Sequence, residues 1–185
     1  MTKKALLAFH GVILSASLLL TACQQETPVN RTPLPPVANA PYICDHIPLD
    51  AVRLMTGVNE PIVTGNFDLT SGNWGSGNCF AYQRTGSRPR VLDVNLSPAG
   101  SKQEVEYRIQ RGAKRLPDMV PGAAGFYFQD GSADNTQAIA VLMRDNDRLI
   151  VELVRGVKGR DNAADVVALM RLVAPKLLPA KKAKG

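Results

Sequence analysis

The apolar and polar positions of this chain alternate most clearly between residues 91 and 96. Leu92, Val94 and Leu96 share one face of an extended segment there, and Asp93 and Asn95 share the other. Weaker patterns of the same kind predict five more strands, at residues 62–69, 79–84, 125–129, 137–144 and 149–155. Residues 138–143 are apolar on both faces, which predicts a central strand, and Asp145-Asn146-Asp147 predicts a tight hairpin after it.

Apolar residues at helical spacing predict three helices. The first is short and lies between Pro48, which suits a first helical turn, and Gly57, which suits a helix stop. The second opens at a capping box, residues 101–104, and its apolar stripe consists of Val105, Ile109, Gly112, Ala113 and Leu116. The third is capped by Asp161, and Pro175 is expected to bend or fray its end.

The predicted order of elements is therefore α-β-β-β-α-β-β-β-α. Short links between consecutive strands favour an antiparallel sheet, and amphipathic helices must bury their apolar sides against it. We predict an α+β fold in which an antiparallel sheet of about five or six strands carries the helices on one face.

The first residues have the layout of a bacterial lipoprotein signal peptide. Lys3 and Lys4 precede an apolar run, and Leu20-Thr21-Ala22-Cys23 matches the lipobox, the cleavage signal of lipoproteins, at every position. We predict a signal peptide at residues 1–22 and lipidation of Cys23, which would anchor the protein to the extracytoplasmic face of the cell membrane. The alternative is an ordinary secretory signal in which Cys23 is incidental.

The segment after Cys23 is rich in proline, and residues 23–41 are predicted to form a tether. An extended polyproline tether would reach roughly 55 Å at about 3.1 Å per residue, and a disordered one would reach less far. The rest of the chain is long enough for one domain. We place the α+β domain at residues 42–178 and a basic tail at residues 179–185.

Two further cysteines, Cys44 and Cys79, lie in the predicted domain. An oxidising compartment and an even count favour a disulfide between them. The alternatives are two buried thiols or a metal site with His46, although a Cys-x-His pair with one distant cysteine lacks the paired spacing of a zinc site.

Taken together, the chain resembles a family of small actinobacterial cell-envelope lipoproteins of unknown function. The resemblance covers residues 42 to about 178, beside the lipobox and the Pro-rich linker. It rests on Cys44-Asp45 before a short helix, Cys79 in an early strand, and the turn Pro121-Gly122-Ala123-Ala124-Gly125 before a hairpin. Ala123-Ala124 replaces the acidic residue expected in that turn. The family has no known activity, so the resemblance implies no catalytic residue.

The sequence offers little recognisable catalytic chemistry. His46 is the only histidine after the predicted signal peptide, and there is no Gly-x-Ser-x-Gly elbow or glycine-rich phosphate loop. Residues 130–135 alternate oxygen-bearing side chains but lack the glycine and glutamate positions of a calcium loop. We predict no catalytic residue, metal ligand or cofactor. The net charge of +6, two of which come from Lys3 and Lys4, is too small to indicate nucleic acid as a partner.

Two features suit binding instead. Trp74 lies among glycines and is a candidate aromatic anchor, with packing over the disulfide as the alternative. Arg108, Arg111 and Arg115 form a basic surface on the second predicted helix, with a merely solvated face as the alternative. We predict a lipid-anchored, non-catalytic binding module for an envelope protein or another envelope component. The other hypotheses are an enzyme of unrecognised type acting on an envelope substrate, and a carrier of an apolar ligand.

Overall fold

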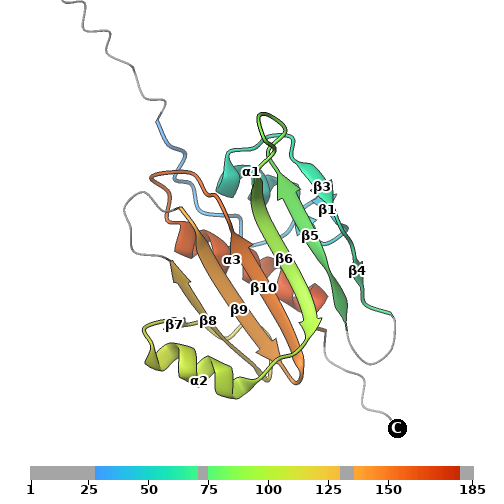
Figure 1. Cartoon of the computed structure of the whole chain (residues 1–185), viewed down its shortest axis with the longest axis vertical. Helices are drawn as coiled ribbons and strands as arrows, with labels where there is room; N and C mark the ends of the chain where they lie inside the picture. The colour runs from blue at the N-terminus through green and yellow to red at the C-terminus, as the bar shows by residue number, and fades with distance from the viewer. Residues whose placement is uncertain (1–27, 71–74, 130–135, 180–185) are drawn as a thin grey trace, which may run out of the picture.

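The computed structural model describes residues 28–70, 75–129 and 136–179. Its centre is an eight-stranded antiparallel sheet with the order β3-β5-β6-β10-β9-β8-β7, in which β4 also pairs with β5 (Figure 1). This confirms the predicted antiparallel α+β class with more strands than expected. The strands are β3 (Ile62–Thr64), β4 (Phe67–Asp68), β5 (Ser76–Tyr82), β6 (Arg90–Pro98), β7 (Lys114–Arg115), β8 (Ala123–Gln129), β9 (Ala138–Arg144) and β10 (Asp147–Leu153).

The strand predicted at residues 62–69 is divided into two short strands, β3 and β4, and a glycine lies between them. Gly65 separates β3 from β4 with a φ of +98°, and a Cβ at this position would lie 2.3 Å from the Asn78 backbone oxygen. Only glycine adopts this conformation without strain and allows so close an approach. A second glycine of positive φ, Gly77 (φ +139°), lies inside β5, which begins three residues before the predicted start.

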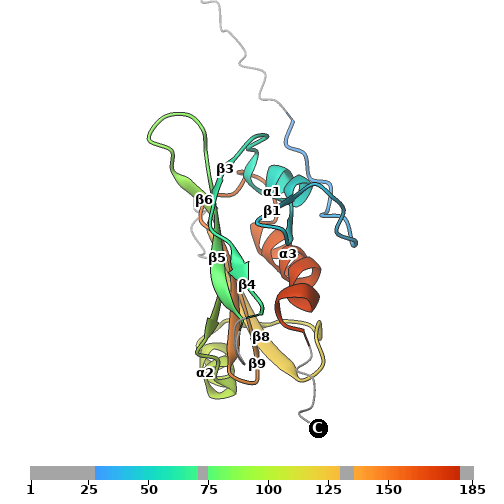
Figure 2. The same cartoon turned by 90° about the vertical axis from the view of Figure 1, so that its right-hand side faces the viewer.

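The main core lies between the sheet and two helices, α1 (Leu49–Thr56) and α3 (Asn162–Leu177), which cover the same face (Figure 2). Gly57 ends α1 with a φ of +71°. The Asp161 side chain accepts a hydrogen bond from the Ala164 N–H at 2.9 Å, as expected for an N-cap. Pro175 lies inside α3, and the helix ends two residues later, at Leu177. A short ladder of β1 (Tyr42–Ile43) and β2 (Ile47–Pro48) precedes α1.

The helix α2 (Lys102–Gln110) packs on the opposite face of the sheet (Figure 2). Its Val105 is fully buried against Phe126, Val141 and Met143, which point away from the main core. The prediction that all helices share one face is therefore wrong. β9 is apolar on both faces because it lies between β10 and β8 and is buried against the main core on one face and against the smaller core under α2 on the other. Its predicted central position is confirmed.

The second helix is also shorter than its predicted apolar stripe. It ends at Gln110, and Gly112 (φ +98°) turns the chain so that Lys114 and Arg115 form β7. Leu116 then enters the main core on the other face. The Ser101 side chain makes no capping hydrogen bond, although its carbonyl accepts one from the Glu104 N–H at 3.0 Å.

The predicted tether packs against α3 over part of its length. Leu34 is buried in the main core, and the Arg160 guanidinium donates hydrogen bonds to the carbonyl oxygens of Asn30 and Thr32. Arg160 also makes a two-bond ion pair with Asp165 at 2.7 and 2.8 Å. Both side chains are almost fully buried, with exposed fractions of 3% and 6%. The chain is thus attached to the domain from about Asn30, well before residue 42.

The predicted disulfide joins Cys44, before α1, to Cys79 in β5. The Cα atoms lie 6.0 Å apart, and the bridge spans a sequence separation of 35 residues. Cys79 is buried in the main core, so the bridge fixes the start of the domain to β5, the strand next to one edge of the sheet.

Removing this bridge is expected to lower the free energy of unfolding by about 3–4 kcal/mol, because a loop of this size regains its conformational freedom in the unfolded chain. The measurement is thermal or denaturant unfolding of the Cys44→Ala/Cys79→Ala variant. Reductant should destabilise the wild-type protein and leave the double variant unchanged. Equal stability of the two proteins without reductant would contradict the structural role.

Candidate functional site

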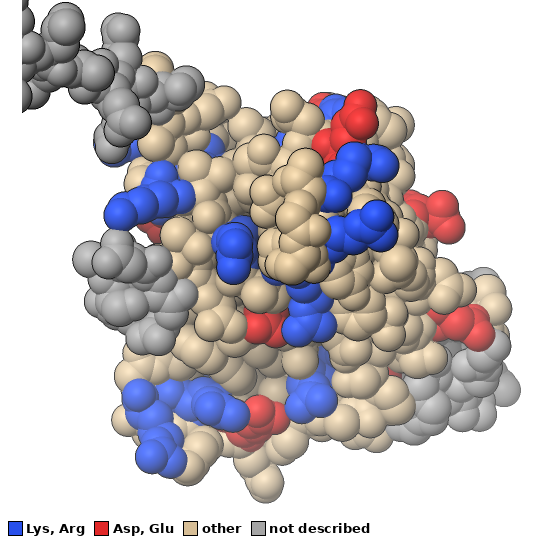
Figure 3. All heavy atoms as spheres, turned by 45° about the horizontal axis from the view of Figure 1, so that its top comes forward, with Lys and Arg blue, Asp and Glu red and all other residues tan. Residues whose placement is uncertain are grey.

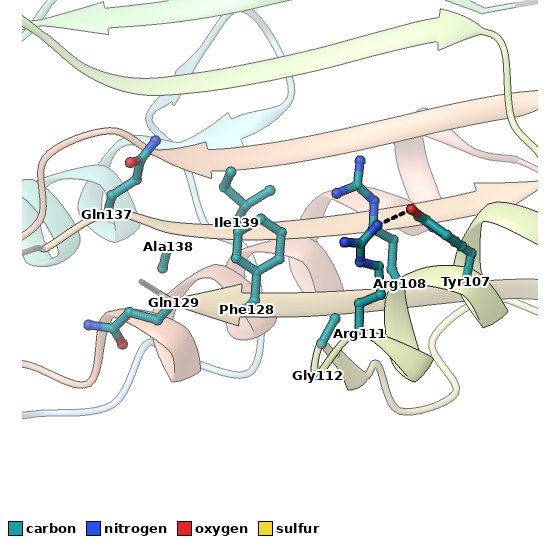
Figure 4. A pocket seen from close by; sticks show the side chains of 10 residues that line it. Tyr107, Arg108, Arg111, Gly112, Phe128, Gln129, Gln137, Ala138 and Ile139 are labelled. Atoms are coloured by element: carbon teal, nitrogen blue, oxygen red, sulfur yellow. Dashed lines mark hydrogen bonds between the residues drawn. The ribbon is translucent and has the colours of Figure 1, made fainter. Parts of the chain in front are cut away.

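An open groove lies on the outer face of the sheet, between α2 and the neighbouring ends of β8 and β9 (Figure 4). Its volume is about 730 Å³, within the roughly 300–1,000 Å³ typical of sites for small ligands. It combines basic, aromatic, amide and small apolar side chains, from Tyr107, Arg108, Arg111, Gly112, Ala113, Phe128, Gln129, Gln137, Ala138 and Ile139.

The second, smaller core holds α2 in place above the sheet. Val105 is the buried centre of this contact, and Ile109 and Ala113 pack around it. With these apolar positions turned toward the sheet, Tyr107, Arg108 and Arg111 are left along the rim of the groove. The same packing therefore stabilises α2 and presents its polar side chains to a ligand.

The two arginines of the rim are each held against an aromatic ring. The Arg108 guanidinium lies 5.9 Å from the centre of the Phe126 ring, and that of Arg111 lies 5.2 Å from the centre of the Tyr107 ring. Arg111 also donates a hydrogen bond to the Tyr107 hydroxyl (Figure 4). Such cation–π contacts restrict the long side chains without neutralising their charge.

The charges of these arginines are poorly compensated. Arg108 has a long 3.8 Å contact with Glu104, and within the part of the chain that the structure describes, Arg111 pairs with no carboxylate. None of the described residues that line the groove is acidic. Figure 3 shows Lys and Arg side chains spread over the whole visible face, with fewer Asp and Glu side chains between them. The groove is therefore electrostatically suited to an anionic group.

Arg115 is separated from the other two predicted arginines. It lies on β7 and makes two hydrogen bonds with the Glu106 carboxylate, at 2.7 and 2.9 Å. Hydrogen bonding to Arg115 lowers the pKa of Glu106, and hydrogen bonding to Glu106 raises the pKa of Arg115. The prediction of one basic helical surface thus needs correction, because only Arg108 and Arg111 reach the groove.

The floor of the groove is apolar. The Phe128 ring stacks on Phe126 at an angle of 12° and is 37% exposed, which is high for a phenylalanine on a sheet. Ile139 continues this surface on β9, whereas the side chain of its neighbour Ala138 is buried in the main core on the other face. Gln129 and Gln137 lie at the end away from the arginines (Figure 4). A ligand along the groove would thus contact amide groups at one end, the apolar floor in the middle and cationic groups at the other end.

Two carboxylates lie beside each other on the adjoining part of the outer face. Asp93 on β6 is directly opposite Glu152 on β10, and Gln137 donates a hydrogen bond to Glu152 at 2.7 Å. Burial raises the pKa of Asp93, the nearby Arg90 lowers it, and the Glu152 charge raises it. One Asp93 carboxylate oxygen is buried without a hydrogen-bond partner among the described residues.

The raised pKa gives Asp93→Asn a pH-dependent effect on stability. Because the folded state holds the Asp93 proton more tightly than the unfolded state, wild-type stability falls as pH rises from the ordinary pKa of 3.8 through the raised value. The variant lacks this titration and should gain stability relative to wild type between pH 3 and pH 7. Denaturant midpoints at both pH values measure the gain. Glu152→Gln removes the neighbouring negative charge that helps to raise the Asp93 pKa, so the gain in stability from Asp93→Asn should be smaller in that background. An equal stability difference between Asp93→Asn and wild type at both pH values would contradict the argument.

The remaining predicted site residues have different outcomes. Cys23 and Trp74 lie outside the described residues, as does the segment 130–135. Sequence reasoning missed Tyr107 and Phe128, which are exposed aromatic residues within otherwise regular elements. The sequence contains a signal for both residues. Tyr107 directly precedes the candidate Arg108, and Phe128 is two residues after Phe126 and therefore on the same face of β8.

Neither metal binding nor membrane crossing is indicated by the described residues. Among them, no group of three or more His, Cys, Asp or Glu side chains is arranged to hold a metal ion. No helix in the same part of the chain is long and apolar enough to span a membrane. Comparison with protein-family models gives no match, and comparison with curated proteins gives none either.

Proposed function

We propose that this protein is a lipid-anchored, non-catalytic binding module of the cell envelope, and that it binds through the groove between α2, β8 and β9. The lipobox and Cys23 support the anchor. The resemblance to small actinobacterial envelope lipoproteins agrees with this location. A protein partner or another envelope component would occupy the groove.

The observation that carries the proposal is the composition of the groove. Two preorganised guanidinium groups lie beside an apolar floor, and the described lining residues bring no carboxylate, thiol, hydroxyl nucleophile or imidazole other than the Tyr107 phenol. Ligand sites of this type use apolar surface for affinity and a few polar groups for orientation. The arrangement is therefore better suited to holding a ligand than to transforming one.

A second candidate function is catalysis by the Asp93–Glu152 pair. The raised pKa of Asp93 favours it, since a carboxyl group whose pKa is raised can serve as a general acid or base. However, Asp93 makes a 3.1 Å ion pair with Arg90 and does not line the groove. Loss of a measured turnover in both Asp93→Asn and Glu152→Gln would support this function.

The carrier hypothesis has weaker support. An apolar ligand between the sheet and the helices would need space that large side chains fill. Leu92, Leu149 and Met170 are fully buried there, with an exposed fraction of 0% each. The described groove lies on the other face, and charged and amide groups lie beside its apolar floor.

The proposed function is tested with the full-length lipidated protein in nanodiscs, incubated with detergent-solubilised and fractionated envelope from the producing organism. A fraction should bind the wild-type protein and the Arg115→Gln variant equally, and bind Arg108→Gln/Arg111→Gln at least about 10-fold more weakly. Arg115→Gln is the matched control because Arg115 is an exposed arginine outside the groove. Binding should weaken with salt, which reduces the Debye length to about 3 Å at 1 M. Equal binding by all variants would reject the groove, and turnover of a component would favour the enzyme.

A further inference from the structure

We propose that the groove recognises an extended peptide segment of a partner protein, in which an aspartate or glutamate adjoins an apolar side chain. This rests on the proposed function and specifies the ligand of the same site. It commits to a protein ligand rather than to lipid headgroups or an anionic polysaccharide, which offer a negative charge as well.

The acidic side chain of the peptide would be bound by Arg108 and Arg111. A guanidinium presents donors in a planar fork that matches a carboxylate. Both guanidiniums are held by aromatic rings, at 5.9 and 5.2 Å from the ring centres, so little side-chain entropy is lost when an anion binds. Arg111, which pairs with no carboxylate among the described residues, would contribute most of the charge recognition.

The apolar side chain of the peptide would lie on Phe128 and Ile139. Phe128 is 37% exposed despite its place on β8, and Ile139 lies beside it on β9. Covering this surface releases water and favours an aliphatic or aromatic side chain. A polysaccharide that is charged at every repeat would leave the apolar floor unused. The pairing of cations with an apolar floor therefore favours a peptide.

The position of the groove argues against lipid headgroups. Arg160 holds the tether at Asn30 and Thr32, so the chain between Cys23 and Asn30 can reach only about 25 Å at roughly 3.5 Å per residue. In Figure 1 the first described residues of the tether lie near the upper end of the domain, and α2 lies at its lower end. A domain anchored through Cys23 would thus present the α2 end away from its own membrane.

The proposal is tested by selecting from a random decapeptide display library on the full-length lipidated protein in nanodiscs, with empty nanodiscs for counter-selection. The enriched peptides should carry Asp or Glu within two positions of an apolar residue. Fluorescence anisotropy of a labelled enriched peptide should show about 10- to 100-fold weaker binding by Arg111→Gln and less than about twofold change by Arg115→Gln. Replacing the peptide's acidic residue by its amide should weaken binding to wild type by a similar factor, which needs no protein variant.

Other outcomes separate this proposal from the proposed function. Failure to enrich any peptide, enrichment of peptides without a carboxylate, or equal effects of Arg111→Gln and Arg115→Gln would overturn the peptide proposal. Arg111-dependent binding of polygalacturonate, or of vesicles of phosphatidylglycerol and phosphatidylcholine, without peptide enrichment would overturn it while leaving a binding module in place. If neither these probes nor any envelope fraction binds, both proposals are wrong.

Discussion

Replacing Arg160 by methionine is expected to lower the free energy of unfolding by about 3–5 kcal/mol, a large part of the 5–15 kcal/mol typical of a domain. The Asp165 carboxylate, only 6% exposed, would lose two hydrogen bonds and its counter-ion in a place where water cannot replace them. For a chain of this size the melting temperature should fall by about 6–20 °C.

The same substitution should release the tether. Arg160 donates to the carbonyl oxygens of Asn30 and Thr32, and these contacts fix the chain beside α3. Trypsin should therefore cleave after Arg31 faster in the variant, even at temperatures where the domain stays folded. This local readout separates loss of the attachment from loss of global stability.

Two further variants show whether the cause is the buried charge. Arg171→Met, at an exposed position on α3, should change stability by no more than about 0.5 kcal/mol. Arg160→Met/Asp165→Leu removes both charges and should recover much of the lost stability, because two apolar side chains replace a buried ion pair with little net cost. A double variant as unstable as Arg160→Met would show that lost packing, rather than an unpaired Asp165, is responsible.

The sequence predicted the elements whose local signals agree with their packing. The strand around Leu92, Val94 and Leu96 was clear because apolar residues occupy its buried face and polar residues occupy the other, half-buried face. The last helix was found because Asp161 is a true side-chain cap and the apolar spacing of α3 matches a buried face. Local and tertiary preferences coincide at these places.

The misplaced elements are those that depend on tertiary contacts. The apolar stripe assigned to the second helix mixed Val105, which packs on the outer face of the sheet, with Leu116, which packs on the inner face. The turn at Gly112 separates them, and a helical periodicity count does not register such a turn. The packing of the tether was missed for a similar reason. Its composition suggests only a linker, but the buried Leu34 and the distant Arg160 hold it against the domain.

The candidate site was only partly predictable from the sequence, because it also depends on tertiary contacts. Arg108 and Arg111 were identified by their charge, whereas the role of Arg115 depended on Glu106, nine residues away along the chain. The apolar floor arises only when β8 and β9 pair and bring Phe128 opposite Ile139. Side-chain types are read from the sequence, but the choice of partner among them is set by the sheet register.

Replacing Cys23 by alanine is expected to move the protein from the membrane to the soluble fraction, or to leave the precursor uncleaved. The lipobox requires the cysteine thiol as the acceptor of the lipid, and stable anchoring takes two or more acyl chains. Membrane flotation and the mass of the mature N-terminus measure the two results. Thr21→Ser keeps a small hydroxylated residue in the lipobox and should leave the protein lipidated and membrane-bound.

The packed tether makes this prediction sharper than the lipobox alone. Because the chain is attached to the domain from about Asn30, only a few residues separate the predicted anchor at Cys23 from the folded domain that carries the groove. Cys23→Ala should therefore weaken the apparent binding to partners fixed in the envelope, because the effective concentration falls, while the affinity for a soluble peptide stays unchanged, since Arg108 and Arg111 are untouched. A signal-cleaved Cys23→Ala protein that still floats with membranes would contradict lipid anchoring and would require another attachment.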